Sequence, residues 1–545
     1  MTDAAARTDA LFEAWTRPGE PGGALLVLQG GEVVHRADYG LANLEHAVPI
    51  APGTRFHIAS ITKGFAAAAL LILEARGKLR LDDPCGRYLP ELPAELNVSI
   101  RRLLDMTSGL RDAMEMMRLR GIWFRYPRSA RDLMELLYAQ REFSFPTGER
   151  YVYTNVNYML AALIVENVTG QPWDQFCRDN IWAPLGMADT GMRDDCQLVW
   201  PRLADGYVQE KAGGHTKGVW AFGISGAGSM VSTVEDLARW VLCLRQGSLG
   251  GVALSAPMTT PGRLNDGRLN HYGLGLHCRP YRGLTVIGHG GSLTGYKGMI
   301  CHVPDRDWGF VLLSNREDAD PYGRVQQLFD LWLGDSAPRP RPAEEARALW
   351  PKLELAAETV AALPGRWVDR DTAELATITL KDGTLELDKL GNVQSFRATG
   401  PGRLLADWSQ FDSTLEIHER RGEPPLLDLD FGGQELRLHK LERAHDYGRE
   451  GLELFCGSYS SRELAATHEV FLRDGALVIR LGPAFHEAAE LPLQATLEDC
   501  FLAQDTRPGY TYALALRFER SEWGRVESVV LSTDRLKGVR FLKTA

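Results

Sequence analysis

The stretch Ser60-Ile61-Thr62-Lys63, followed by the apolar segment 64–73, decides how the rest of the chain is understood. Residues three apart on a helix lie on one face, so the Lys63 Nζ can reach the Ser60 Oγ. A serine hydroxyl is a poor nucleophile until a neighbouring group takes its proton. The following segment is apolar nearly all round, which predicts a buried helix. Burial and nearby cations lower a lysine pKa, so Lys63 is a candidate base near neutral pH.

The position of Ser60 at the start of a helix adds a second function. The first amides of a helix have no partner within it, so the Ser60 N–H can stabilise an oxyanion that develops on a substrate. A Ser-x-x-Lys motif also arises by chance in a chain of this length. The assignment therefore depends on two further motifs.

The first of these is Tyr153-Thr154-Asn155, just before a predicted helix. A tyrosine beside a lysine ammonium ionises more easily and can serve as a base or proton shuttle. Asn155 can donate to a substrate carbonyl and also contact the lysine. The alternative is a tyrosine in a β-hairpin, with Asn155 acting only as a helix N-cap.

The second motif is His289-Gly290-Gly291, which follows an apolar strand and precedes Ser292. Glycines such as Gly291 allow a substrate backbone to lie against the strand edge. The Ser292 N–H is a candidate for the second oxyanion donor, and His289 for orienting the substrate. The alternative is a glycine-rich turn with an incidental histidine.

Composition excludes several classes of protein. The chain has 545 residues and a net charge of −10, which argues against nucleic acid or an anionic membrane as partner. The N-terminus lacks the pattern of a signal peptide, and no apolar run is long enough to span a bilayer. The eight scattered cysteines indicate reduced thiols in a cytoplasmic protein. No metal-binding or cofactor-binding motif is present, so we expect neither metal nor cofactor.

The chain divides into regions that differ in predicted secondary structure and in composition. Residues 1–335 begin and end with predicted strands and have helices between them, which suggests one antiparallel sheet built from both ends with a helical lobe beside it. The sheet's late strands are expected at 272–278, 284–288, 298–303 and 309–314. Residues 336–355 form a linker rich in proline and charge.

The C-terminal part carries an internal repeat. Gly365-Arg366-Trp367 and Gly457-Ser458-Tyr459 each precede alternating strands joined by an Asp-Gly turn at the same offset. The repeat predicts two small antiparallel β-barrels, at 356–444 and 445–545. Two unrelated β-sandwiches remain the alternative.

The three motifs, in this order, resemble those of the penicillin-recognising serine hydrolases, which include class C β-lactamases and DD-peptidases. Thr107-Ser108-Gly109-Leu110 and the segment 226–233 also look like landmarks of that superfamily. The resemblance covers residues 10–335. It implies a multidomain protein, in which an α/β (α+β) β-lactamase/transpeptidase-like domain precedes the two lipocalin-like barrels.

His-x-Gly in place of Lys-Thr-Gly departs from the β-lactamases and is similar to the serine D-aminopeptidases. In that subfamily a loop of the last barrel enters the cleft and recognises the substrate's free amino group. The matching stretch here is 503–510, which is shorter than the family loop, and it offers Asp505 as the carboxylate. A solvated turn residue is the alternative for Asp505.

The expected function is that of a serine hydrolase acting through an acyl-enzyme. Ser60 attacks, and Lys63 and Tyr153 share its proton. By resemblance, the substrate is a small peptide, amide or ester with an N-terminal D-residue. The alternatives are an esterase, a DD-peptidase, a β-lactamase-like enzyme, a peptide-cyclising acyltransferase or a non-enzymatic penicillin-binding sensor. A homodimer is compatible with the sequence.

Overall fold

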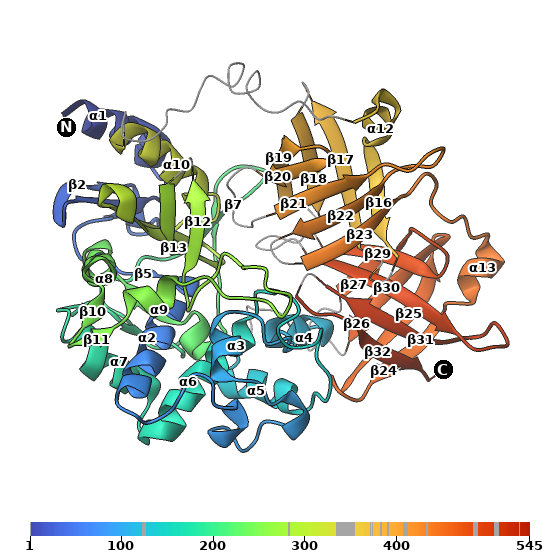
Figure 1. The fold of residues 1–545 in the computed structure, drawn as a ribbon, viewed down its shortest axis with the longest axis horizontal. Coiled ribbons are helices and arrows are strands. Elements are labelled where there is room, and N and C mark those ends of the chain that lie inside the picture. Colours follow the sequence, from blue (N-terminus) through green and yellow to red (C-terminus); the bar gives the residue numbers. More distant parts are fainter. Residues whose placement is uncertain are drawn as a thin grey trace.

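The chain folds into an α/β domain followed by two β-barrels, which lie side by side to one face of it (Figure 1). The linker expected at 336–355 falls almost wholly outside the part that this computed structural model describes. The structure describes residues 2–122, 127–281, 284–333, 355–370, 372, 374–381, 384–389, 392–406, 413–431, 434–482, 489–505, 512–533 and 535–544.

An antiparallel sheet of six strands forms the centre of the first domain, in the order β12-β13-β14-β15-β1-β2. The strands are β1 (Gly23–Gln29), β2 (Glu32–Tyr39), β12 (His277–Tyr281), β13 (Leu284–Leu293), β14 (Tyr296–Val303) and β15 (Trp308–Ser314). Leu26 pairs with Val311, which joins the early strands to the late ones. The prediction of one sheet built from both ends of this region is confirmed.

One expected strand, 272–278, is wrong over most of its length, because regular pairing begins only at His277. The segment before it bends at Gly275, whose φ is +78° and whose backbone lies against the Lys63 carbonyl. A side chain at that position would meet the Lys63 oxygen at 2.8 Å. The bend brings Gly275 against the start of α2 (Thr62–Ala75), and the Tyr272 hydroxyl lies 3.1 Å from the His289 Nε2.

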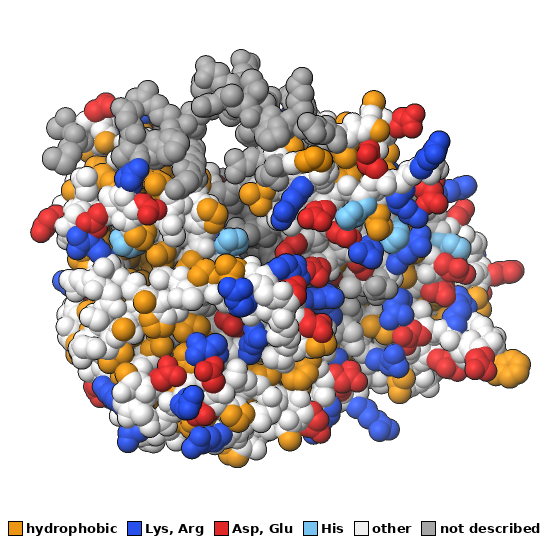
Figure 2. Space-filling model, viewed as in Figure 1, with side chains coloured by type: hydrophobic (Ala, Val, Ile, Leu, Met, Phe, Trp, Pro, Cys, Tyr) orange, Lys and Arg blue, Asp and Glu red, His pale blue; other side chains and the backbone are white. Residues whose placement is uncertain are grey.

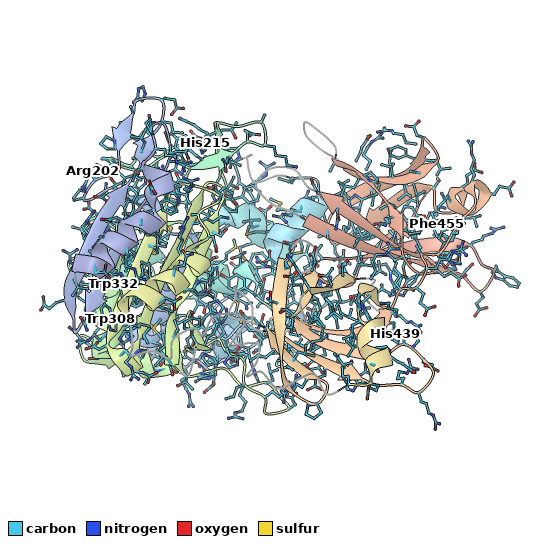
Figure 3. All side chains as sticks on the ribbon, turned by 90° about the horizontal axis from the view of Figure 1, so that it is seen from above. Arg202, His215, Trp308, Trp332, His439 and Phe455 are labelled. Atoms are coloured by element: carbon cyan, nitrogen blue, oxygen red, sulfur yellow. The ribbon has the colours of Figure 1, made fainter. Side chains whose placement is uncertain are left out.

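Helices cover both faces of the sheet. On one face α1 (Thr2–Leu11) packs against α10 (Pro321–Trp332), and the rings of Trp308 and Trp332 lie 5.9 Å apart at this layer (Figure 3). On the other face lie α2, α8 (Val234–Gln246) and the lobe that surrounds α6 (Asn155–Thr169). The remaining helices of the domain are α3 (Ile100–Leu104), α4 (Ala113–Leu119), α5 (Ala130–Tyr138), α7 (Trp173–Cys177) and α9 (Ser255–Thr259).

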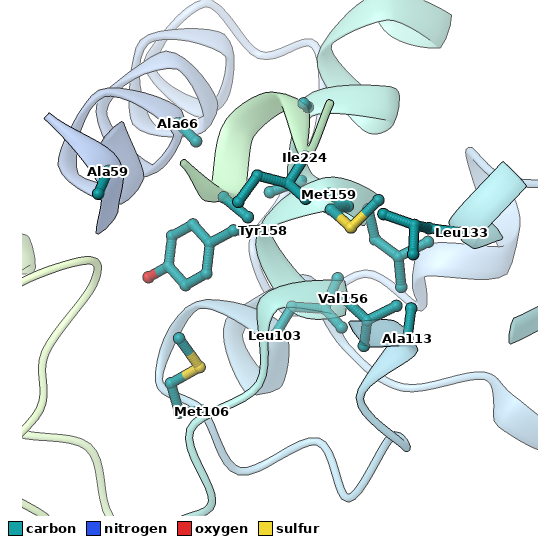
Figure 4. Close-up of a cluster of buried hydrophobic side chains, with 14 of the residues drawn as sticks. Ala59, Ala66, Leu103, Met106, Ala113, Leu133, Val156, Tyr158, Met159 and Ile224 are labelled. Atoms are coloured by element: carbon teal, nitrogen blue, oxygen red, sulfur yellow. The ribbon is translucent and has the colours of Figure 1, made fainter. Parts of the chain in front are cut away.

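The apolar segment after Lys63 is buried as its composition predicts, with every residue from Thr62 to Leu73 inside the domain. It packs against α6, whose Tyr158 and Met159 lie in a cluster with Ala66 and Ile224 (Figure 4). Burying a large apolar side chain contributes about 1.5–3 kcal/mol relative to exposure. Two helices held in this way give the functional residues at their N-termini a rigid base.

Short strands and turns complete this domain. They are β3 (Leu41–Asn43), β4 (Val48–Pro49), β5 (Phe56–His57), β6 (Gly191–Met192), β7 (Tyr207–Gln209), β8 (His215–Lys217), β9 (Met230–Ser232), β10 (Ser248–Leu249) and β11 (Val252–Ala253). The pairing of β5 with β9 leads the chain directly into the turn that carries Ser60.

The first barrel is closed, and its interior is filled by apolar side chains that alternate along the strands. After α12 (Ala357–Ala362), its strands are β16 (Gly365–Asp369), β17 (Leu375–Lys381), β18 (Thr384–Lys389), β19 (Asn392–Gly400), β20 (Arg403–Ala406), β21 (Ser413–His418), β22 (Leu426–Phe431) and β23 (Gln434–Lys440). The prediction of a barrel is confirmed for this copy.

The second barrel is one nine-stranded antiparallel sheet that curls around a core containing Phe455 (Figure 3). After α13 (Arg449–Glu453), its strands are β24 (Gly457–Ser461), β25 (Ala466–Arg473), β26 (Ala476–Gly482), β27 (Ala489–Pro492), β28 (Gln494–Ala495), β29 (Cys500–Asp505), β30 (Tyr512–Arg520), β31 (Val526–Ser532) and β32 (Val539–Lys543). Acidic and basic side chains are interspersed over the barrels (Figure 2).

The structure also bears on the state of the cysteines and on membrane-spanning helices. All eight cysteines are free thiols. Among the described residues, no helix combines the length and the apolar character needed to cross a bilayer.

Candidate active site

Ser60 lies in a tight turn, Ala59–Ile61, that immediately precedes α2. Ala59 has a φ of +48°, a left-handed conformation that is costly for a residue with a side chain. Such strain persists only where the surrounding structure enforces it, and here the turn is packed against β13 and β14. Ser60 itself is half-buried, so its hydroxyl is held at the edge of the domain interior.

Lys63 lies one helical turn beyond Ser60 and is completely buried. Its Nζ lies 3.1 Å from the Ser60 Oγ, 2.9 Å from the Asn155 Oδ1 and 2.7 Å from the Ala227 carbonyl oxygen. A neutral amine in this position donates to the amide and the carbonyl, and its lone pair then faces the serine hydroxyl. The geometry is that of a general base and its nucleophile.

The electrostatic surroundings favour this neutral amine. Burial lowers the Lys63 pKa well below its usual range, and the positive charge of Arg535 lowers it further. The Asp112 carboxylate acts in the opposite direction. Lys63 can therefore accept a proton from Ser60 at a lower pH than an exposed lysine could.

Tyr153 covers the other side of the lysine. The Lys63 Nζ lies 4.8 Å from the centre of the Tyr153 ring, within cation–π range. Burial raises the Tyr153 pKa, while contacts with the Ser60 hydroxyl and Arg535 oppose that rise. The expectation that Tyr153 ionises more easily is therefore wrong, because burial outweighs the hydrogen bond with Ser60 and the charge of Arg535. Tyr153 carries its proton and can only relay it.

Asn155 is held at the first turn of α6 by Asp112. The Asn155 backbone N–H and the Thr154 hydroxyl donate to Asp112 Oδ2 at 2.7 and 2.9 Å. The other oxygen of Asp112 accepts from the Met114 and Glu115 backbone N–H groups at the start of α4. One buried carboxylate therefore caps two helices and fixes the residue that contacts Lys63. The sequence signal was an Asp just before a helical pattern.

His289 lies on β13 and is buried. Its Nδ1–H donates to the Gly290 carbonyl at 2.6 Å, so its Nε2 accepts from the Tyr272 hydroxyl at 3.1 Å. Burial, together with the nearby Lys63, lowers the His289 pKa to about 3. His289 is a neutral, fixed imidazole, which can orient neighbouring groups but brings no positive charge to the site.

Gly291 passes so close to the Ser60 turn that only glycine fits. A Cβ at Gly291 would lie 2.2 Å from the Ile58 carbonyl oxygen. The pairing of β12 with β13 ends at Gly288, so the segment that reaches Ser292 is not covered by β12. Ser292 is exposed at the end of β13. A substrate can approach this edge beside Ser60.

Asp505, the candidate for binding an ammonium group, is the last residue of β29 and is 3% exposed. A solvated turn residue would be more open than this. Residues 506–510 of the expected loop lie outside the described residues, so their entry into the site stays a prediction. The barrel residue that the structure places against Tyr153 is Arg535, which belongs to no sequence motif.

The fold and this site define a class of protein: an α/β domain whose strand edge faces a Ser-x-x-Lys helix is the arrangement of the penicillin-recognising serine hydrolases. Residues 8–331 match the family model described as Beta-lactamase, and the chain belongs to that family.

Several relatives extend the similarity beyond this domain. The chain is 24% identical to the D-aminopeptidase of Brucella melitensis biotype 1 over 533 residues, which covers 96% of this chain and 95% of the relative. It is 29% identical to penicillin-binding protein 4* of Bacillus subtilis (strain 168), over 57% of this chain and 72% of that protein.

Solved structures with a similar fold include an amidase and a penicillin-binding protein homologue. The D-amino acid amidase of Ochrobactrum anthropi, complexed with L-phenylalanine amide, is 26% identical with a TM-score of 0.51, over 62% of this chain and all of that one. The octameric penicillin-binding protein homologue from Pyrococcus abyssi shares the fold with a TM-score of 0.55 at 22% identity, over 80% of this chain and 99% of that one.

Proposed function

We propose that the protein hydrolyses amide or ester bonds of small substrates through an acyl-enzyme on Ser60. The observation that carries the proposal is the fully buried Lys63, whose Nζ lies 3.1 Å from the Ser60 Oγ. No described carboxylate forms an ion pair with Lys63, so its burial is costly, and a lowered pKa beside a nucleophile is typical of a catalytic base. The contact of Lys63 with the serine hydroxyl therefore favours a catalytic role over a purely structural one.

The reaction begins when the Ser60 Oγ attacks the substrate carbonyl and Lys63 accepts the hydroxyl proton. The tetrahedral oxyanion is stabilised by the backbone N–H groups of Ser60 and Ser292. Protonated Lys63 then passes a proton through the Tyr153 hydroxyl to the leaving group, and the acyl-enzyme forms. Water, activated by the same pair, releases the acid and restores Ser60.

We further propose that the preferred substrates carry an N-terminal D-residue, so that the enzyme is a D-stereospecific aminopeptidase. Support comes from the D-aminopeptidase relatives that match nearly the whole chain, barrels included. The eight free thiols favour the cytoplasm as compartment. The esterase, DD-peptidase and cyclase alternatives differ only in which leaving group or acceptor the same acyl-enzyme uses.

The decisive experiment is intact-protein mass spectrometry after incubation with p-nitrophenyl acetate at short times. Wild type is expected to gain one acetyl group on Ser60, and Ser60→Ala none. Ser460→Ala, at a half-buried serine of β24, is the matched control and should behave like wild type. An acetyl group mapped to another residue, or retained in Ser60→Ala, would contradict the mechanism. Rates with D-Ala-p-nitroanilide and L-Ala-p-nitroanilide then measure stereospecificity.

A further inference from the structure

The hairpin of β13 and β14 carries Ser292 next to its turn, and charged side chains gather around this residue. Ser292 pairs with Lys297 across the two antiparallel strands, so their side chains lie on the same face of the sheet. The Lys297 Nζ donates to the Ser292 Oγ at 2.7 Å. A cation on β14 is therefore bonded to the side chain of the residue whose backbone N–H is the proposed second oxyanion donor.

Glu317, which lies just beyond β15, joins this lysine to the turn of the hairpin. One of its carboxylate oxygens lies 2.6 Å from the Lys297 Nζ, and the other accepts the Gly295 N–H at 2.6 Å. The Glu317 backbone N–H donates to the Tyr207 carbonyl at 2.9 Å, which anchors the main chain of this residue as well. One carboxylate thus fixes two points of the hairpin, the turn and the residue opposite Ser292.

The strand before Ser292 provides little rigidity of its own. The pairing of β12 with β13 ends at Gly288, so β12 gives no support to the segment beyond that point. Three of the four residues before Ser292 are glycines, which have more backbone freedom than other residues. Side-chain contacts at Ser292 restrict that freedom beside the nucleophile.

Formation of the hairpin does not account for these contacts. The turn consists of Thr294 and Gly295, and the φ of Gly295 is +80°, a conformation that glycine adopts readily in a two-residue hairpin turn. Such a turn sets the register of the strands by itself, whereas ordering a lysine side chain costs conformational entropy. The Lys297 and Glu317 side chains are only 18% and 22% exposed, so water screens their ion pair less than it screens a surface pair. The arrangement favours a role at Ser292.

We propose that Lys297 and Glu317 are positioning residues, which fix Ser292 so that its backbone N–H is already in place when the oxyanion forms. The inference rests on the proposed acyl-enzyme function. An oxyanion donor stabilises the transition state through its preorganisation, so a donor that has to move during the reaction loses part of its effect. Neither side chain needs to touch the substrate, because both act through Ser292.

The test is stopped-flow acetylation of Ser60 by p-nitrophenyl acetate, which separates the maximal acylation rate from the dissociation constant of the ester. Lys297→Met keeps a side chain of similar length without the ammonium. It should lower the maximal rate about five- to fiftyfold, which is part of the about hundred- to thousandfold cost of removing a donor. The dissociation constant should stay within about twofold, because the lost interaction forms only in the transition state. Lys297→Arg restores a donor and should recover most of the rate. Glu317→Gln should lower the rate in the same direction.

A boronic acid gives a second readout, which a purely structural role would not change. Phenylboronic acid forms a tetrahedral adduct with a serine Oγ and places an oxygen where the oxyanion would lie, so it resembles the transition state. Its inhibition constant should rise in Lys297→Met by the factor by which the acylation rate falls. All variants are compared at a temperature at which circular dichroism shows them fully folded. An unchanged acylation rate, or a lower rate with an unchanged inhibition constant, would overturn the assignment.

Arg245→Met is the matched control. Arg245 on α8 pairs with Asp307 in the connection between β14 and β15, so this ion pair also fixes a turn of the sheet, at the opposite end of β14 from Lys297. The acylation rate and the inhibition constant should equal those of wild type, and a loss as large as in Lys297→Met would contradict the assignment. Failure of wild type to be acetylated on Ser60 would instead contradict the acyl-enzyme, so the two proposals fail in different ways.

Discussion

Asp112 contributes both to the stability of the fold and to the position of Asn155 beside Lys63. It is fully buried, and its two oxygens accept from the Thr154 hydroxyl and from the backbone N–H groups of Met114, Glu115 and Asn155. In Asp112→Asn one oxygen becomes an NH₂ group, which cannot accept. The Thr154 hydroxyl can rotate, but at least one buried N–H loses its partner. That loss costs about 1–3 kcal/mol, and weakening the charged cap adds about 1 kcal/mol.

We therefore expect Asp112→Asn to lower the free energy of unfolding by about 2–4 kcal/mol. Urea denaturation followed by tryptophan fluorescence measures this value. Asp82→Asn is the control, because Asp82 is an exposed carboxylate that pairs with Arg101. Pairs of that kind contribute about 0–1 kcal/mol. A change in Asp112→Asn no larger than in the control would refute the argument that one carboxylate caps both helices.

The same substitution makes a signed prediction for the pH profile. Lys63 acts as a base only when neutral, so the acid limb of kcat/KM follows its pKa. Asp112 raises that pKa and Arg535 lowers it. The limb should therefore move to lower pH in Asp112→Asn and to higher pH in Arg535→Gln. Movement of both variants in one direction would show that Lys63 does not set this limb.

Two further substitutions test how the strand edge is built. Gly291→Ala would place a Cβ 2.2 Å from the Ile58 carbonyl oxygen, so it should push β13 away from the Ser60 turn and lower both stability, by about 1–3 kcal/mol, and turnover. Gly448→Ala, where a Cβ meets nothing within 4 Å, should leave both unchanged in denaturation and rate assays. Tyr272→Phe removes the hydroxyl that donates to His289 and should lower the free energy of unfolding by about 1 kcal/mol in the same denaturation assay. An unchanged free energy of unfolding would mean that this hydrogen bond does not fix the imidazole.

Local sequence patterns predicted the parts of the site that local structure builds. The three-residue spacing of Ser60 and Lys63 places both residues on one face of a helical turn. The segment that follows them is apolar nearly all round, so it was predicted to be buried. That a substrate backbone lies against the strand at Gly291 stays a prediction from the sequence, and the contact of Gly291 with the Ile58 carbonyl needed the tertiary structure. The central sheet followed from strand patterns at both ends of the domain.

Contacts between distant parts of the chain were beyond the reach of these patterns. Arg535 lies in a short connection with no periodicity, and only the docking of the second barrel brings it to Tyr153. Tyr272 was expected within a strand, because alternation over 272–278 does not reveal the bend at Gly275. The raised Tyr153 pKa depends on how completely its neighbours exclude water, which a motif does not encode.

The connection at Arg535 has a consequence for how the enzyme becomes active during folding. Ser60 and Arg535 are separated by nearly the whole chain, and contacts of that separation form late because of the entropy of loop closure. A folded first domain would then have its nucleophile in place before the barrel supplies the last charge. Refolding the full chain should give a phase in which p-nitrophenyl acetate acetylates Ser60 at a rate that changes again when the barrel docks, because Arg535 lowers the Lys63 pKa.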